Sequence, residues 1–182
     1  MACSGNMLAI LGGDKCFVQK LVTDSGKISL EDKEVLSFDS QVRKMVVKCD
    51  RITFMFNNSL ESYRLDGDTL FSTELMFSCE LQDLTCYDDS GNIWILLDVE
   101  GFIHVANMEI GNLSSSKCVT VNGSDNFFDK SIISIFHSRA EECLFLGHNN
   151  KTCSKVSIQY CQSEGEMKIL GDNQIVQVYF CL

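Results

Sequence analysis

The sequence has 182 residues, 45% of them hydrophobic and 22% charged, and its formal net charge is -10 because 25 acidic residues outnumber 15 basic ones. This composition indicates a globular chain long enough to bury a core, and it excludes a disordered protein and, since proline is absent, a proline-rich linker. The acidic balance argues against direct nucleic-acid binding, which needs a concentration of basic residues; the one basic cluster, interpreted as a solvated edge, is Arg43, Lys44, Lys48 and Arg51.

No stretch of the sequence approaches the roughly 20 apolar residues of a membrane span. The amino terminus lacks a positively charged region, and its apolar run from Met7 to Leu11 is shorter than the core of a secretory signal. We therefore interpret the chain as intracellular, cytoplasmic or nuclear, with no membrane partner.

The ten cysteines are scattered without a CxxC pair, and several lie in apolar runs such as "CLFLG" and "VYFCL". Free cysteine behaves there as a small buried hydrophobe, so reduced thiols are expected. The alternative is a secreted or lumenal chain with disulfides and glycans. Sequons that would matter in that case occur at Asn57, Asn112, Asn122 and Asn150.

In chain order the sequence shows short runs of Val, Ile, Phe, Thr and Leu between turn residues, and no long segment of helical periodicity. Turn sequences such as "DSGN" at 89–92 and the two-residue turn Glu100-Gly101 join these runs. The sixteen predicted strands are Met7–Leu11, Cys16–Val22, Val35–Phe38, Met45–Lys48, Ile52–Phe56, Ser62–Leu65, Thr69–Ser72, Leu84–Tyr87, Ile93–Leu97, Phe102–Ala106, Lys117–Val121, Ile132–Phe136, Cys143–Leu146, Lys155–Gln159, Met167–Leu170 and Ile175–Phe180.

Three segments of the sequence align with one another, beginning "KMVVKCDRITF", "DLTCYDDSGNIWILL" and "SIISIFHSRAEECLFL". Each contains an apolar strand, a more apolar second strand, an alternating third strand and a weaker fourth strand. The equivalent starts Met45, Leu84, Ile133 and Ile175 are 39, 49 and 42 residues apart. Four short strands in about 40 residues predict an all-β chain of antiparallel four-stranded blades, a β-propeller.

The most apolar strand of each segment is expected to be the second strand of a blade. Blades of a propeller pack face to face, so their middle strands are covered on both faces and read as continuous apolar runs. The run "IWILL" at 93–97 fits this position, and "ITFMF" and "CLFLG" are its counterparts. The next strand, "FIHVA", alternates more and is expected nearer the edge of the sheet.

The two ends of the chain are predicted to complete one blade together. Residues 7–38 would supply strands two, three and four, and residues 174–181 the missing first strand. The other blades cover approximately 42–73, 82–122 and 131–171. This predicts a single domain over 1–182, either a closed ring of four blades or the first part of a larger ring of about seven, whose open edge would need a partner.

In its pattern of blades the sequence resembles the WD40-like β-propellers over nearly its whole length. The family's Trp-Asp pair at the end of the third strand is absent, because these strands end "YRLDG", "HVANM" and "VSIQY". The pair Gly147-His148 follows a second strand and does not precede a first one, so it does not match the family's Gly-His pair. The resemblance implies a scaffold that presents loops to other proteins.

No pattern of catalytic or metal-ligating residues is recognised in the sequence. His104, His137 and His148 are each expected to be surface or hydrogen-bonded structural residues. Cys143 and His148 lie at the two ends of one predicted strand, so they are not expected to form a nucleophilic pair or a zinc site. The sequence therefore predicts no catalytic residue, no metal and no cofactor.

Two loop sequences that resemble ligand-binding motifs are interpreted as turns. "LGGDK" at 11–15 lacks the spacing of a phosphate loop and no helix follows it. Asp88-Asp89 and "DGD" at 66–68 begin turns, and the calcium-loop spacing does not occur.

Aromatic residues supply the single candidate for partner binding. Trp94 is flanked by Ile93 and Ile95 and is expected to pack between blades, with an interface anchor as the alternative. Phe127 and Phe128 lie side by side in the polar loop "GSDNFFDK". They either close the core from above or bind a partner protein.

The sequence thus predicts a non-catalytic protein-interaction scaffold, a propeller module acting within a larger intracellular assembly. Its partners would be other proteins in a complex, without nucleic acid or small molecules. The first alternative is the secreted or lumenal binding domain with disulfides and glycans. The second is an enzyme with a site in the central channel of the ring, where few charged residues are expected.

Overall fold

The computed structural model describes residues 1–4, 7–25, 27–66, 69–108, 116–117, 120–121, 130–161 and 166–176. Within these ranges all regular secondary structure is β-strand, and none contains a helix long and apolar enough to cross a membrane. The chain divides into two structural units. The first consists of Met1–Phe77 with Asp89–Gly91, and the second of Ser78–Asp88 with Asn92–Leu182.

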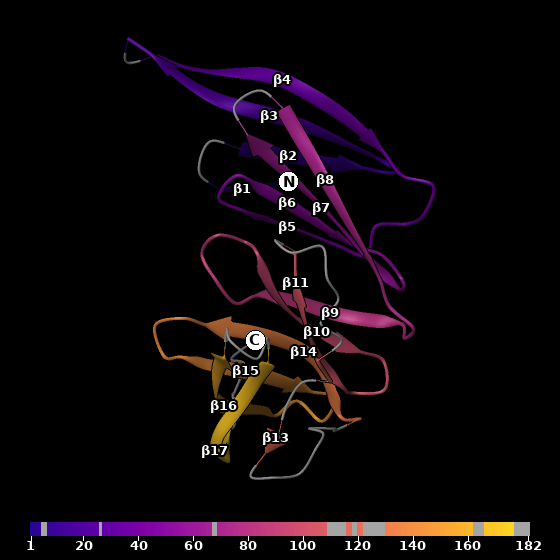
Figure 1. The fold of residues 1–182 in the computed structure, drawn as a ribbon, viewed down its shortest axis with the longest axis vertical. Helices are drawn as coiled ribbons and strands as arrows, with labels where there is room; N and C mark the ends of the chain where they lie inside the picture. The colour runs from indigo at the N-terminus through magenta and orange to yellow at the C-terminus, as the bar shows by residue number, and fades with distance from the viewer. Residues whose placement is uncertain are drawn as a thin grey trace. The chain divides into compact units, whose positions relative to one another are not determined.

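The first unit contains two antiparallel sheets of four strands, which we call blade 1 and blade 2 (Figure 1). Their strand orders are β1-β2-β3-β4 and β5-β6-β7-β8, so every strand pairs with its neighbour in the sequence. The strands are β1 (Ala2–Ser4), β2 (Met7–Gly12), β3 (Lys15–Asp24), β4 (Lys27–Ser37), β5 (Lys44–Lys48), β6 (Arg51–Met55), β7 (Ser59–Asp66) and β8 (Thr69–Met76).

The second unit contains two further sheets, blade 3 with the order β12-β11-β10-β9 and blade 4 with the order β13-β17-β16-β15-β14. All pairs in them are antiparallel except β13 with β17, which run parallel. The strands are β9 (Leu81–Cys86), β10 (Ile93–Asp98), β11 (Ile103–Asn107), β12 (Ser116–Lys117), β13 (Thr120–Val121), β14 (Ile132–Ser138), β15 (Cys143–His148), β16 (Cys153–Cys161) and β17 (Glu166–Val176). The prediction of an all-β chain built from antiparallel blades is therefore confirmed.

The middle strands are buried as their apolar runs predict. All five residues of β6 are buried, and so are Trp94 to Asp98 in β10. The corresponding strand of blade 4 differs, because Phe145 in β15 is only half-buried between Leu144 and Leu146, which are buried. The apolar runs of β6 and β10 thus belong to strands covered on both faces, whereas β15, although its run is also apolar, is fully covered on one face only.

The core of the first unit lies between blades 1 and 2. Alternate residues of β2 and β3, such as Ala9 and Cys16, are fully buried, and they belong to one cluster with Ile52 and Phe54 of β6. The ring of Phe38, which follows β4, lies 4.6 Å from that of Phe54 between centroids. Aromatic pairs at this spacing contribute beyond the area they bury.

The core of the second unit lies between blades 3 and 4. It contains Ile95 and Leu97 of β10 together with Leu144 and Leu146 of β15, all buried. Around it, side chains of β9 donate to and accept from the backbone of β14, the edge strand of blade 4. Gln82 Nε2 donates to the Ile133 carbonyl at 3.0 Å, Ile135 N donates to Asp83 Oδ2 at 2.9 Å and His137 N donates to Thr85 Oγ1 at 3.2 Å. These bonds satisfy backbone groups that an edge strand otherwise leaves unpaired.

Blade 1 has a first strand of its own, so the prediction that residues 174–181 supply it is wrong. Ala2–Ser4 pairs with β2, for example Cys3 with Leu8. Residues 174–176 instead continue β17 and pair with β16, and 177–182 lie outside the described residues. The predicted strand Met167–Leu170 does not end at the sequence "LGDNQ". Leu170 pairs with Ser157 and Gln174 pairs with Lys155, so residues 171–173 between them form a bulge within β17 and not a turn.

The predicted strand Lys117–Val121 divides between two sheets. Ser116–Lys117 pairs with β11 in blade 3, whereas Thr120–Val121 pairs in parallel with β17 in blade 4. The outer strand of each sheet, β11 in blade 3 and β17 in blade 4, has backbone groups on its open side. One part of the segment therefore pairs with β11 and the other part with β17.

The hairpin of β3 and β4 is longer than predicted. β4 begins at Lys27, eight residues before the predicted start at Val35, and the two strands pair from Lys15–Ser37 to Asp24–Lys27. Figure 1 shows this hairpin in indigo, with its long strands running to the turn near Ser25. The added part, "KISLEDKE", is largely charged, and its two apolar residues, Ile28 and Leu30, are exposed, so its apolar signal is weaker than that of the other strands.

The turn after β10 is also longer than the predicted two-residue turn. Four residues, Val99–Phe102, separate β10 from β11, and Asp98 N donates to the Phe102 carbonyl. Gly101 takes the left-handed conformation with φ 89°. The turn after β15 has the same bonds, from His148 N to the Thr152 carbonyl and from Lys151 N to the His148 carbonyl, and there the left-handed residue is Lys151 with φ 66°.

Substitutions at the left-handed residues of the two turns should have opposite effects on the free energy of unfolding. Lys151→Gly should raise the free energy of unfolding by about 0.5–1 kcal/mol, because a side chain is costly at positive φ. Gly101→Lys should lower the free energy of unfolding by about 1 kcal/mol for the same reason. Urea unfolding of both variants measures this, and changes of the same sign would contradict the equivalence of the two turns.

Candidate functional site

Phe127 and Phe128, the partner-binding residues predicted from the sequence, lie outside the described residues. Side chains that can bind ligands or exchange protons instead lie close together in the second unit, at the hairpin ends of blades 3 and 4. The sequence analysis did not identify this location.

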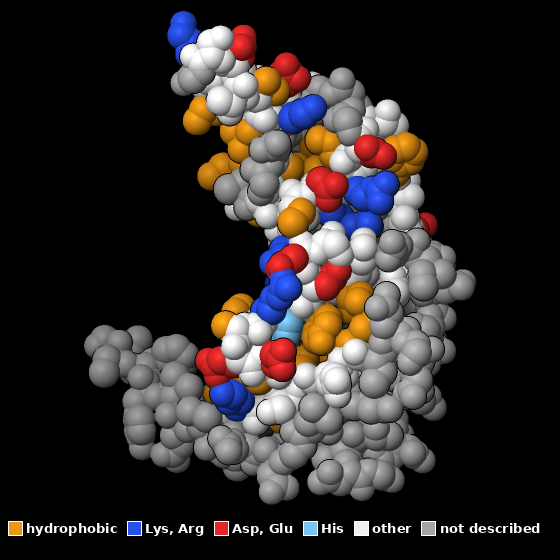
Figure 2. All heavy atoms as spheres, turned by 60° about the vertical axis from the view of Figure 1, so that its left-hand side comes forward, with side chains coloured by type: hydrophobic (Ala, Val, Ile, Leu, Met, Phe, Trp, Pro, Cys, Tyr) orange, Lys and Arg blue, Asp and Glu red, His pale blue; other side chains and the backbone are white. Residues whose placement is uncertain are grey.

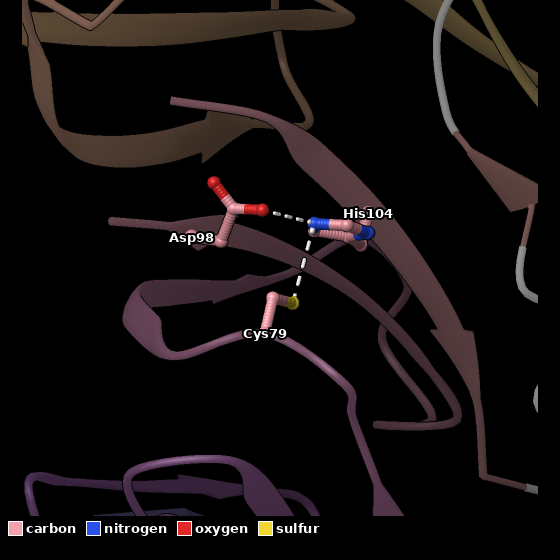
Figure 3. Close-up of side chains that lie close together, drawn as sticks. All are labelled: Cys79, Asp98 and His104. Atoms are coloured by element: carbon pink, nitrogen blue, oxygen red, sulfur yellow. Dashed lines mark hydrogen bonds and ion pairs between the residues drawn. The ribbon is translucent and has the colours of Figure 1, made fainter. Parts of the chain in front are cut away.

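Three side chains meet at the hairpin end of blade 3: Cys79, Asp98 and His104 (Figure 3). The Nε2 atom of His104 lies 2.8 Å from Asp98 Oδ2 and 3.7 Å from Cys79 Sγ. One ligand-type atom from each side chain lies within 4.8 Å of the other two. The carboxylate of Asp98 is 4% exposed and the imidazole of His104 is 23% exposed, and Cys79 is half-buried, so the histidine and the cysteine face solvent more than the carboxylate does.

The backbone explains why these three residues meet. Asp98 is the last residue of β10 and His104 the second of β11, and the pairing of Leu97 with Ile103 places them on either side of the turn. Asp98 Oδ1 accepts from Glu100 N at 3.0 Å and Phe102 N at 2.8 Å, so the carboxylate holds the turn with one oxygen and His104 with the other. Cys79 lies two residues ahead of β9.

The geometry does not suit a cysteine nucleophile. Burial first, and then the charge of Asp98 and a hydrogen bond to it, raise the pKa of the Cys79 thiol, whereas a nucleophile needs a lowered pKa. Asp98 and Cys79 also contact the same nitrogen of His104, whereas in a triad the carboxylate orients the base through its other nitrogen. The cluster is not arranged for acyl transfer.

A second trio lies at the same place in blade 4. His148 is the last residue of β15, Ser154 is the second residue of β16, and Ser131 directly precedes β14. Ser131 Oγ lies 2.6 Å from His148 Nδ1, and His148 Nε2 bonds to Ser154 Oγ. Both ring nitrogens of the histidine are therefore hydrogen-bonded to neighbouring hydroxyls.

The two trios occupy matching positions of the sheet. Asp98 and His148 each face the first residue of strand one, Leu81 and Ile132, and each donates its backbone N–H across the same four-residue turn. We call each trio a hairpin clasp, because its hydrogen bonds join the end of strand two, the start of strand three and the segment ahead of strand one. The shared role of both clasps is structural.

A third histidine lies between blades 3 and 4. The ring of His137 stacks on Tyr87 at 4.8 Å between centroids, and its Nδ1 atom lies 3.2 Å from the Cys86 carbonyl. The hydroxyl of Tyr87 accepts from Tyr160 N at 3.2 Å. Each histidine of the chain thus has a hydrogen-bond partner, as the sequence analysis expected.

The other residues singled out in the sequence have the expected structural positions. Trp94 is fully buried. Asp88 caps its turn, because its Oδ1 accepts from Ile93 N at 2.8 Å. Cys143 and His148 lie at opposite ends of β15. The segment 11–15 contains the turn between β2 and β3, in which Gly13 has φ 66°.

The clasps were missed because no local pattern marks them. Their members are separated by up to 25 residues and belong to three backbone segments. One signal was available: a polar residue ends strand two of both segments, at Asp98 in "WILLD" and at His148 in "FLGH", where the pattern otherwise favours apolar residues. The length of each turn is needed before that residue can be placed opposite another side chain.

The fold is similar to that of solved WD40-like β-propeller proteins. Sqt1 from Chaetomium thermophilum aligns with a TM-score of 0.64 and 13% identity, over 96% of this chain and 46% of that one. The N-terminal domain of Nup159 aligns with a TM-score of 0.58 and 13% identity, over 95% of this chain and 42% of that one. Hsv2p from Kluyveromyces lactis aligns with a TM-score of 0.53 and 12% identity, over 88% of this chain and 55% of that one.

These comparisons confirm the fold expected from the blade pattern. No family model and no curated protein matches the sequence. The chain spans about half the length of these three solved propellers.

Removing the carboxylate of the blade 3 clasp tests its structural role. Asp98→Ala should lower the free energy of unfolding by about 2–4 kcal/mol, because it leaves two backbone donors and His104 without their acceptor. Urea unfolding followed by tryptophan fluorescence measures the loss, since Trp94 is buried in the same strand.

Asp66→Ala is the matched control. Its carboxylate is 68% exposed and pairs with Arg64 at 3.6 Å, so its removal should cost less than about 1 kcal/mol. Equal losses from both variants would contradict a structural role for the clasp.

Proposed function

We propose that the chain is a non-catalytic protein-interaction scaffold that works inside a larger intracellular assembly and binds a partner protein through an uncovered face of blade 1. The observation that carries the proposal is a row of exposed apolar side chains across three strands of that blade. The partner would present an apolar sheet face of its own.

The row, which we call the blade 1 row, consists of Ile10, Phe17 and Val35. Ile10 pairs with Phe17 and Phe17 with Val35, so the three side chains stand next to each other on one face of the sheet. They are 37%, 45% and 52% exposed, although each belongs to a residue type that is usually buried. Figure 2 shows hydrophobic side chains, in orange, at the surface of the upper part of the molecule, where Figure 1 places β3 and β4.

The opposite face of the same strands is the core of the unit. Ala9, Cys16 and Leu36 alternate with the members of the row and are buried. Polar residues border the row along the strands, with Lys15 exposed at one end and Gln19 bonded to Asp32 at 2.6 Å at the other. An apolar centre with a polar rim is the usual anatomy of a protein interface.

Blade 4, in the other unit, shows a similar but smaller feature. Phe136 is 62% exposed, and it pairs with Phe145 at 6.4 Å between ring centroids. Lys155, on the next strand, lies with its ammonium group 5.9 Å from the Phe145 centroid. This face carries a charge, so we place the primary partner site on the blade 1 row.

A propeller blade is stable when both of its faces are covered by neighbouring blades. The described residues cover one face of blade 1, and the chain covers between 42% and 72% of the solved propellers to which it is similar. A second protein that supplies further sheet would cover the other face. With a net charge of -10, the chain favours a neutral or basic partner.

The first measurement is size-exclusion chromatography with light scattering on the purified chain. We expect concentration-dependent self-association through the blade 1 row when no partner is present. A double variant, Phe17→Lys with Val35→Thr, should shift the chain to a monomer without lowering its midpoint of urea unfolding. Proteins that copurify with the chain from cells should be lost with the same variant.

Phe71→Lys is the control for this variant, because Phe71 is 54% exposed on β8 of blade 2 and lies outside the row. It should change neither self-association nor copurification. A wild-type chain that is monomeric at all concentrations and loses no copurifying protein on mutation of the row would overturn the proposal.

A secreted or lumenal binding domain is the second candidate. Asn57 and Asn150 are exposed, so two of the sequons are accessible to glycosylation. Against it, no disulfide joins the cysteines whose side chains the structure describes, which are Cys16, Cys49, Cys79, Cys86, Cys143 and Cys153.

Thiol counting separates the two candidates. In denaturant without reductant we expect close to ten reactive thiols per chain, as the ten cysteines of a reduced protein require. In the folded chain at pH 8, exposed Cys49 should react well before Cys16, since burial raises the pKa of Cys16 to about 11. A count of few thiols would favour the secreted candidate.

A further inference from the structure

We propose that Cys79, Asp98 and His104 of the blade 3 clasp bind one divalent transition-metal ion of the zinc type. Thiolate, imidazole and carboxylate are the ligands that Zn²⁺ takes in proteins. The sequence analysis expected no metal, because the three residues follow no recognised spacing. The proposal is independent of the scaffold function.

The three ligand atoms lie within 4.8 Å of one another, and one of the two closer distances already fits a tetrahedral ion. Bond lengths to Zn²⁺ place a sulfur and a nitrogen ligand about 3.6 Å apart, and a nitrogen and an oxygen ligand about 3.4 Å apart. Sγ of Cys79 and Nε2 of His104 are already 3.7 Å apart, whereas Nε2 and Asp98 Oδ2 are 2.8 Å apart. Entry of an ion therefore requires one contact to open by about 0.6 Å, a shift within reach of a histidine side-chain rotation.

The surroundings hold the ligands in place. Asp98 Oδ1 is occupied by the N–H groups of Glu100 and Phe102, so Oδ2 is directed towards the other two ligands. Such outer contacts orient ligands and raise affinity in known metal sites. His104 and Cys79 are both partly exposed, so water can reach the cluster and supply a fourth ligand.

The two clasps share a structural role but differ in the side chains that could bind a metal ion. The blade 4 clasp has the same frame, but it places hydroxyls of Ser131 and Ser154 around His148. Hydroxyls are weak ligands for zinc, and hydrogen bonds to them are sufficient for a clasp. The blade 3 clasp has a thiol and a carboxylate among its three members, which a structural clasp alone does not require.

Binding of the metal ion displaces the proton of the Cys79 thiol. Without metal, Asp98 accepts from the imidazole N–H of a neutral His104, and the protonated Cys79 thiol lies 3.7 Å from the same nitrogen. On binding, the thiol proton leaves to solvent and the imidazole proton moves to Nδ1, so that sulfur, nitrogen and oxygen each direct a lone pair at the ion. One proton is released for each ion bound.

The test is titration of the purified, chelator-treated full chain with Co²⁺, which reports zinc sites by its colour. We expect one Co²⁺ per chain with the visible bands of a four-coordinate ion and a thiolate-to-cobalt charge-transfer band, both removed by Zn²⁺. Cys79→Ser should abolish the charge-transfer band, and His104→Gln should weaken Co²⁺ affinity at least about tenfold.

Cys49→Ser is the control, because this exposed cysteine is not in the cluster, and it should leave every band unchanged. Far-UV circular dichroism and urea midpoints confirm that each variant is folded, and Cys79→Ala serves if the serine variant is not. Absence of the cobalt bands in the wild-type chain, or their persistence in a folded Cys79 variant, would overturn the proposal.

Discussion

A sheet of four short strands has two faces and cannot bury either of them by itself, and the rest of this structure depends on that constraint. β6 and β10 are buried along nearly their whole length because both of their faces are covered. Blade 1 buries the face that carries Ala9 and Leu36 and leaves the face of Phe17 exposed. An exposed row of apolar side chains therefore marks a sheet face that the described residues leave uncovered.

Edges impose a second constraint, because an edge strand presents backbone groups without partners. In the second unit, side chains of β9 supply partners to the backbone of β14. Asp83 and Thr85 accept from its N–H groups, and Gln82 donates to one of its carbonyls. The same constraint explains why Thr120–Val121 pairs at the outer edge of blade 4, although Ser116–Lys117, just before it in the sequence, pairs in blade 3. Polar side chains of β9 thus take part in the packing between blades 3 and 4.

The two hairpin clasps show how one backbone frame supports different chemistry. A four-residue turn with a left-handed third residue brings the end of strand two beside the start of strand three in both blades. In blade 4 the frame carries hydroxyls around His148, and in blade 3 it carries a thiol and a carboxylate around His104. The frame is structural in both cases, and the identity of the side chains decides whether it also suits a cation.

The sequence by itself determined the elements that depend on local patterns: the apolar runs, the turns between them and the period of about 40 residues that indicates blades. It did not reveal Ala2–Ser4 or the outer part of β4, because short or charged strands owe their conformation to pairing and not to burial. Only the tertiary structure decided that Gly171–Asn173 is a bulge, that Lys117–Val121 divides between sheets, and that Cys79, Asp98 and His104 meet. Register and turn length set such contacts, and a change of one residue in either moves a side chain to the opposite face of its sheet.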